Sequence, residues 1–153
     1  MNRFRLAVLI AALCGCGSPP PKQRNQITLA IEPADESRRF PRADRLALQL
    51  VHDHVLGKEF LPGGNVAEHK WNGRTYQQFL VRAANSEAAG LLLFDFKGHL
   101  RDAKYLAHMG GYFGMDGAAP VYLFQKGVFL AGFVGLPEKD ADALARQFAA
   151  RLD

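Results

Sequence analysis

The sequence has only two cysteines, and both lie within its first sixteen residues, at Cys14 and Cys16. The rest of the chain therefore has no residue for a cysteine nucleophile, a thiolate zinc site, a CxxC redox centre or a disulfide. Aliphatic hydroxyl groups are also scarce, and the complete set is Ser18, Thr28, Ser37, Thr75 and Ser86. None of the serines lies in a Gly-x-Ser-x-Gly context, so the nucleophile elbow of α/β-hydrolases is absent.

Long hydrophobic runs and dense charge of one sign are missing as well. The uninterrupted apolar run Leu6–Leu13 is far shorter than the ~18–20 residues that span a bilayer. The formal net charge is +4, from 19 basic and 15 acidic residues that are scattered along the chain. No stripe of Lys and Arg alternates with aromatic residues, so we expect no nucleic-acid partner.

The one dense basic group is Arg38-Arg39, with Arg42 and Arg45 close behind. Two interpretations of this group stay open. It is either the solvated start of a helix or a patch that meets anionic headgroups or an acidic partner.

The N-terminus carries a targeting signal. Arg3 and Arg5 precede the short apolar run, and small residues follow it, as in secretory signals. The run ends in Leu13-Cys14-Gly15-Cys16, which resembles the lipobox of bacterial lipoproteins. That resemblance implies cleavage before Cys16, attachment of a diacylglyceryl group to its thiol and often acylation (palmitate, for example) of the new amino group.

The resemblance implies an exported protein of the cell envelope, anchored by lipid at Cys16 to a bacterial membrane. In a Gram-negative host, Gly17 after the cysteine implies the periplasmic face of the outer membrane. Removal of residues 1–15 takes away two of the 19 basic residues and leaves a net charge of +2. We expect three parts: residues 1–15 as signal peptide, residues 16–25 as lipidated cysteine and Pro-rich tether, and residues 26–153 as one globular domain.

In the first half of that domain, alternation over residues 26–32 predicts a strand, and apolar spacing over residues 41–56 predicts a helix. A turn is expected at residues 61–64. Asn72-Gly73, between two alternating segments, predicts a hairpin with a type I′ turn.

In the second half, Asn85 is placed to cap a helix, and residues 90–96 fit either a helix or a buried strand. Residues 121–135 predict a second hairpin, and residues 137–152 predict an amphipathic helix. The fold class we predict is therefore α+β, with an antiparallel sheet of four to six strands and two main helices packed against it.

Two resemblances concern the body of the chain. Residues 62–152 resemble uncharacterised exported bacterial domains, a class that implies no activity. The resemblance lies in the order of the elements: a hairpin, Ser-Glu-Ala-Ala-Gly, a Gly-rich stretch, an apolar Lys-Gly segment and a final helix. Residues 119–152 resemble the last third of a thioredoxin fold, with Pro120 as its cis-proline. Because CxxC is absent, this alternative implies a redox-inactive version.

Candidate metal ligands are few. A helix over His52-Asp53-His54 places the two imidazoles about 200° apart, so they do not share one ion. The spacing of His69, His99 and His108 shows no pattern typical of a metal or catalytic site. We expect no metal and no cofactor.

The Gly-rich segment 108–117 is the most unusual stretch of the sequence. It is either a mobile connector or a flexible loop that presents a partner surface made of Met109, Tyr112, Phe113 and Met115. The function we predict is a membrane-anchored envelope lipoprotein that acts as a non-enzymatic interaction or assembly module with an envelope protein partner. The alternative is a small-ligand binder or hydrolase that uses a pocket near residues 99–117, with Asp116 among its polar residues.

Overall fold

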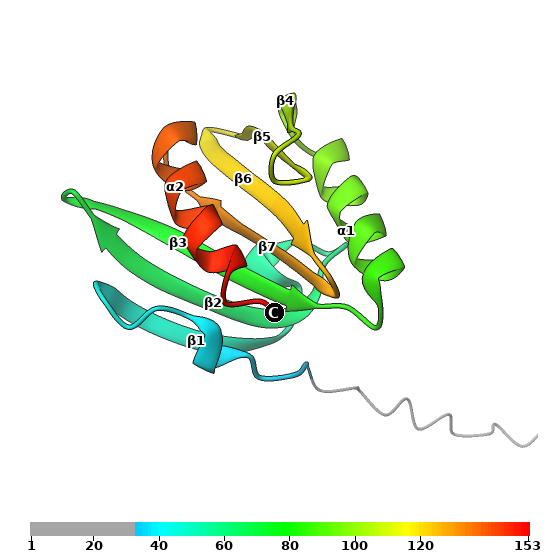
Figure 1. Ribbon diagram of the computed structural model, residues 1–153, viewed down its shortest axis with the longest axis horizontal. Coiled ribbons are helices and arrows are strands. Elements are labelled where there is room, and N and C mark those ends of the chain that lie inside the picture. The colour runs from blue at the N-terminus through cyan, green and yellow to red at the C-terminus, as the bar shows by residue number, and fades with distance from the viewer. Residues whose placement is uncertain (1–32) are drawn as a thin grey trace, which may run out of the picture. The chain divides into compact units, whose positions relative to one another are not determined.

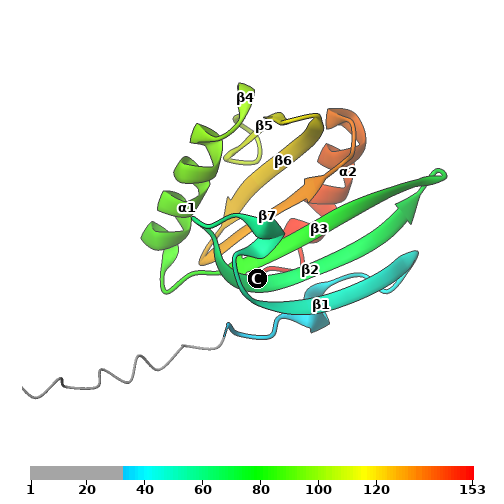
Figure 2. The same cartoon turned by 180° about the vertical axis from the view of Figure 1, so that it is seen from behind.

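The computed structural model describes residues 33–153, which form a seven-stranded antiparallel sheet and two α-helices (Figures 1 and 2). The strands are β1 (Arg45–Asp53), β2 (Pro62–Trp71), β3 (Arg74–Arg82), β4 (Arg101–Leu106), β5 (Gly111–Asp116), β6 (Ala119–Lys126) and β7 (Phe129–Val134). The helices are α1 (Ser86–Gly98) and α2 (Glu138–Ala149), with short 3₁₀ turns η1 (Ser37–Arg39) and η2 (Val55–Gly57). The α+β class is confirmed, but the sheet has seven strands where four to six were predicted. Cys16 and the strand predicted at residues 26–32 lie outside the described residues.

The strand order is β1-β2-β3-β7-β6-β5-β4, and the two helices cover opposite faces of this sheet. Successive side chains of a strand point to opposite faces. On β6, Val121 and Leu123 accordingly pack with α1, whereas Tyr122 and Phe124 pack with α2. In Figure 1 α2 lies in front of the sheet, and in Figure 2 it lies behind.

Both predicted hairpins are confirmed. Asn72 and Gly73 have φ angles of 47° and 76°, the left-handed values that a type I′ turn requires at both central positions. Trp71 pairs with Arg74 across this turn. The hairpin of β6 and β7 turns at Gly127, whose φ is 56°.

The cap and the C-terminal helix are also confirmed. The side-chain oxygen of Asn85 accepts a hydrogen bond from the Ala88 N–H at 2.8 Å, which satisfies one free donor of the first turn of α1. The ambiguous residues 90–96 are helical and form the middle of α1. The predicted helix 137–152 is α2.

The predicted helix over residues 41–56 is wrong, because this segment contains the edge strand β1. Its partner β2 supplies the hydrogen bonds, and Leu48 and Val51 pack partly against the cores on opposite faces. The predicted turn at residues 61–64 is also wrong, since Pro62 begins β2. A Cβ at Gly63 would lie 2.2 Å from the His52 carbonyl oxygen, so this glycine allows β1 and β2 to pair closely.

The expectation of a connector or flexible loop at residues 108–117 is likewise wrong, because β5 occupies most of the segment. Gly111 is buried opposite Phe124, and a Cβ on it would lie 2.0 Å from the Leu123 carbonyl oxygen. Glycine here permits two strands to approach closely, a role that composition alone does not distinguish from a loop.

The thioredoxin-like alternative is not supported by the topology. Every strand pair among residues 33–153 is antiparallel, and Pro120 lies within β6. No peptide bond in these residues is cis.

The two edges of the sheet are β1 and β4, and each carries an irregularity near its start. The register shifts between Arg45 and Ala47 on β1, and between Arg101 and Lys104 on β4. At the second shift Asp102 has a φ of 54°. Both edges are therefore irregular near their start, and β4 carries three charged residues in six.

Candidate functional site

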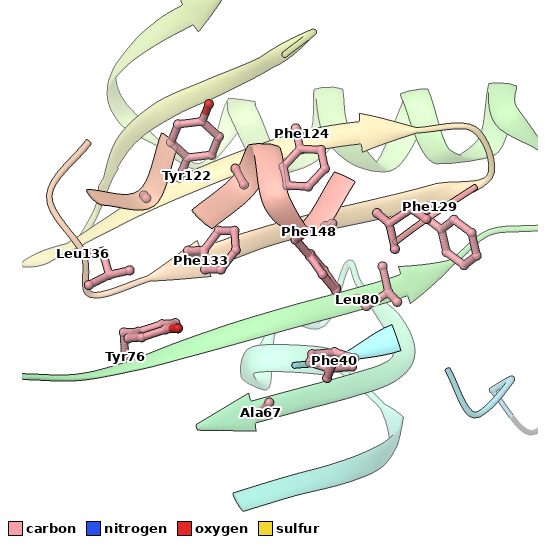
Figure 3. Packing of buried hydrophobic residues seen from close by; sticks show 14 of the residues in the cluster. Phe40, Ala67, Tyr76, Leu80, Tyr122, Phe124, Phe129, Phe133, Leu136 and Phe148 are labelled. Carbon is pink, nitrogen blue, oxygen red and sulfur yellow. The ribbon is translucent and has the colours of Figure 1, made fainter. Parts of the chain in front are cut away.

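A cleft of about 280 Å³ lies between the C-terminal half of α2, the segment before β1 and the sheet. The sheet contributes its floor, α2 one wall and Pro41 the other. The lining residues are Pro41, Tyr76, Gln78, Phe133, Leu144, Gln147, Phe148 and Arg151. Figure 3 shows three of the aromatic rings, on Tyr76 of β3, Phe133 of β7 and Phe148 of α2. The cleft thus has mainly apolar and aromatic walls, with polar side chains from Gln147 and Arg151.

Gln78 is the unusual residue of the floor. Its side chain is 1% exposed, and neither its amide oxygen nor its amide nitrogen has a hydrogen-bond partner among residues 33–153. An unpaired buried polar group costs about 1–3 kcal/mol of stability. Such groups are rare in folded proteins, and one that lines a cleft marks a candidate binding position.

A second unpaired group lies beside this floor. His69 of β2 is 1% exposed, and its Nε2 atom has no partner among the described residues. Its ring stacks on Tyr76 at a centroid distance of 5.3 Å. Burial lowers the pKa of His69, and a hydrogen bond with the backbone of Ala43 only partly opposes this effect, so the imidazole is held neutral. Burial raises the pKa of Tyr76 to about 12, with a further contribution from Asp44.

The α2 wall is fixed by a carboxylate that accepts from three directions. Tyr122 Oη donates to Asp142 Oδ1 at 2.6 Å, Arg146 Nε donates to Oδ2 at 2.9 Å, and His108 Nε2 also bonds to Oδ1. Burial opposes ionisation of Asp142, but the hydrogen bonds outweigh it and hold its pKa at about 2. This Asp142 cluster joins α2 to β6 and to the turn between β4 and β5.

The opposite wall is fixed by another carboxylate, which is fully buried. The Glu36 side chain, 4% exposed, accepts from Arg39 Nε and Arg82 Nη1, each at 2.8 Å. Burial would raise the pKa of Glu36, but these two hydrogen bonds and the arginine charges outweigh burial and lower it. Arg39 also donates to the Arg151 carbonyl oxygen at 2.6 Å, which ties the segment before β1 to the end of the chain.

The residues predicted as a partner surface do not form one patch. Tyr112 packs partly against the core on the α1 face, whereas Phe113 and Met109 pack against the core on the α2 face. Met115 is half-buried on β5 opposite Pro120. A role for these four residues in partner binding stays a prediction.

The polar residues of the predicted pocket near residues 99–117 separate in space. His99 stacks on Phe60 at 4.1 Å, His108 contacts Asp142, and Asp116 pairs with Lys58. His69 is buried beside Tyr76 instead. Among residues 33–153 no three His, Cys, Asp or Glu side chains gather in a way that would hold a metal ion. This arrangement gives the hydrolase alternative no assembled site.

His52 and His54 lie in and just after a strand, not on a helix, so the helical argument about their directions is wrong. His54 follows the end of β1 in a left-handed conformation with a φ of 55°, and its Nε2 lies 3.3 Å from Asp53 Oδ2.

The cleft was not predicted from the sequence. The alternation of Tyr76, Gln78 and Leu80 on β3 was a usable signal, since it places a glutamine between two apolar residues on one face. The walls come from segments distant in sequence, which no local pattern brings together.

In comparisons with known proteins, no family model, curated protein or solved structure matches this chain.

Proposed function

We propose that this chain is a non-enzymatic binding module, exported and anchored by lipid at Cys16, which holds a ligand in the cleft between α2 and Pro41. The lipobox-like N-terminus supports the anchor. The observation that carries the binding role is the unpaired amide of Gln78 in the cleft floor. Within residues 33–153 neither helix is long and apolar enough to cross a bilayer.

The cleft indicates the chemistry of the ligand. A cavity of about 150 Å³ holds a benzene ring, so about 280 Å³ accommodates one ring or a branched apolar group with a short polar extension. The Gln78 amide offers two N–H donors and one acceptor oxygen, and its natural complement is another amide, such as a peptide group. The ligand is therefore an apolar or aromatic side chain next to an amide.

Binding requires a small local movement. Both polar atoms of Gln78 are covered by surrounding protein atoms. Rotation of the side chain about its χ angles brings the amide into the cleft, where the ligand replaces the missing partners. The cost of the unpaired amide is then recovered in the complex, which favours ligands with a hydrogen-bonding end over purely apolar ones.

The test uses phenylacetamide as the probe and the purified chain as the receptor. We expect phenylacetamide to shift the NMR signals of Gln78, Tyr76 and Phe148, and ethylbenzene to bind more weakly. Gln78→Leu should weaken phenylacetamide at least tenfold, about 1.4 kcal/mol. The same variant should raise the free energy of unfolding by about 1–2 kcal/mol, because it removes an unpaired buried amide.

Gln77→Leu is the matched control, since Gln77 is the exposed neighbour on the other face of β3. It should leave probe binding unchanged. Equal affinity of Gln78→Leu and the unsubstituted chain for phenylacetamide would contradict the proposed binding role, and the stability measurement shows that the variant is folded.

The anchor has its own test. Cys16→Ala should abolish incorporation of labelled palmitate and leave the chain uncleaved by the lipoprotein signal peptidase or released from membranes. Cys14→Ala should keep the label, because Cys14 lies in the removed segment. Unchanged labelling of Cys16→Ala would show that the anchor assignment is wrong.

A further inference from the structure

Basic and interfacial side chains gather where the hairpin of β2 and β3 turns. The chain has a single tryptophan, Trp71, and it lies at this turn with 37% of its surface exposed. Leu46 of β1 is 58% exposed. We call this surface the basic hairpin end, and its residues are Arg42, Arg45, Leu46, Trp71 and Arg74.

The pairing of the strands brings these residues together. Arg45 of β1 pairs with His69 of β2, and the Lys70 N–H donates to the Asp44 carbonyl oxygen at 2.9 Å. Trp71 pairs with Arg74 across the turn. In Figure 1 this hairpin projects at the left end of the sheet, beside the start of β1.

The positive charge of this surface exceeds the negative charge near it. Among residues 33–153, none of its three cationic side chains, on Arg42, Arg45 and Arg74, takes part in an ion pair. Two carboxylates are near in the pairing, on Asp44 and Glu68. Glu68 is opposite Ala47 and one position from His69, so it points to the other face of the sheet from Arg45. The basic hairpin end therefore keeps an excess of positive charge.

A hollow of about 290 Å³ adjoins this surface. Three arginines line it, Arg38, Arg42 and Arg45, together with Ser37 and the apolar Phe40 and Leu48. Guanidinium groups and a hydroxyl around a depression are donors for phosphate oxygens. The side chain of Arg38 is 79% exposed, and its contact with Glu36 is long, at 4.0 Å.

We infer that the basic hairpin end docks on a membrane surface of anionic phospholipids, with a headgroup phosphate in the arginine-lined hollow. Tryptophan favours the boundary between headgroups and acyl chains, where its ring is apolar on one side and its N–H is wet. Leu46 adds an apolar contact beside it. Clustered Lys and Arg are attracted to anionic lipid at short range. The combination of a tryptophan, an exposed leucine and three arginines at one hairpin end favours a lipid surface over an acidic protein.

This inference rests on the proposed membrane anchor, which brings the domain to the bilayer. The inference adds which face of the domain contacts the lipid. Docking through the basic hairpin end places one defined face of the domain on the membrane and reduces the freedom that a tether alone leaves.

Trp71 is its own reporter, because it is the only tryptophan. The lipid-modified chain is reconstituted in vesicles of phosphatidylcholine alone or of phosphatidylcholine with 30% phosphatidylglycerol, each containing brominated acyl chains as quenchers. We expect Trp71 fluorescence to be quenched at least twofold more in the anionic vesicles. Quenching should decline as salt is raised towards 1 M, because salt screens exposed charges.

The test variant combines Arg42→Gln, Arg45→Gln and Arg74→Gln, and it should reduce the anionic quenching to the level of neutral vesicles. The matched control neutralises three cations elsewhere, with Lys97→Gln, Arg101→Gln and Lys139→Gln, and should keep the quenching. Equal quenching of Trp71 in both vesicle types would overturn the inference, and so would an equal loss of quenching in the test variant and the control variant. A change in Trp71 fluorescence only on addition of an acidic protein would also overturn it.

Failure of the anchor gives a different result. Co-flotation with neutral vesicles reports the lipid at Cys16 by itself. If the chain does not float with neutral vesicles, the anchor assignment is wrong. In that case, flotation with anionic vesicles and quenching of Trp71 in them test the basic hairpin end without the anchor. Probe binding in the cleft is measured separately through Gln78.

Discussion

Gly111→Ala is expected to lower the free energy of unfolding by about 3 kcal/mol, the upper end of the usual cost of overpacking. The new methyl group would lie 2.0 Å from the Leu123 carbonyl oxygen and 2.9 Å from the Phe124 Cα atom. Both atoms belong to the backbone of β6, so no side-chain rotation relieves the contact. The strands β5 and β6 must separate locally, which breaks hydrogen bonds and disturbs Phe124 in the core. Urea unfolding followed by circular dichroism measures the change.

Gly98→Ala is the control for this substitution. Gly98 ends α1, its φ is not in the left-handed region, and a Cβ there meets nothing within 4 Å. The same chemical change should therefore leave stability unchanged or slightly increased. If Gly111→Ala were as harmless as Gly98→Ala, the segment would be a loop after all and the placement of β5 would be wrong.

Acid is expected to weaken the domain through Asp142. The pKa of this carboxyl is about 2 in the folded chain, against 3.8 ordinarily. A depressed folded pKa contributes stability that is fully present above the ordinary pKa and is lost as pH falls through the folded pKa. The contribution is about 2 kcal/mol, present at neutral pH and lost as pH falls from about 4 to about 2. Unfolding free energies measured across this pH range provide the test.

Asp142→Asn should remove about 2 kcal/mol at pH 7, and the difference from the unsubstituted chain should vanish near pH 2. Asp140→Asn, on the same helix, is the control, because its side chain has no hydrogen bond or ion pair within the described part of the chain. Only the small helix-dipole effect should change there, roughly 0.3–1 kcal/mol. A constant difference between Asp142→Asn and the unsubstituted chain at every pH would contradict the role of the ionised carboxylate.

The sequence predicted the elements whose cause is local. Asn72-Gly73 determines a turn by its backbone preferences alone, and Asn85 caps a helix with an atom three residues from its partner. The helix predicted at residues 137–152 has acidic residues in its first turn and a regular apolar face, and neither feature depends on distant strands. These signals act within a few residues, so they hold in any surrounding fold.

The elements that were missed depend on contacts far along the chain. The spacing of Leu46, Leu50 and Val51 fits a helix, but pairing with β2 makes the segment an edge strand. In the same way, Gly111 has the low propensity of a loop residue and is buried because β6 passes close to it. Tertiary contacts override weak local preferences in both cases.

The candidate site was missed for the same reason. Gln78 becomes unusual only when Phe148 of α2 and Pro41 cover it, and these residues lie on either side of it in the sequence, far from β3. The anchor at Cys16 is a local motif and was proposed from the sequence alone.

The bulges on β1 and β4 have a consequence for chains crowded on a surface. Attachment to a bilayer confines molecules to two dimensions, where neighbours meet edge to edge far more often than in solution. A flat edge strand offers free N–H and C=O groups to the sheet of the next molecule. The register shifts after Arg45 and Arg101 make each row irregular near the start of its strand. If the proposed anchor holds the chain on a bilayer, these irregular edges act against sheets that continue from one chain to the next.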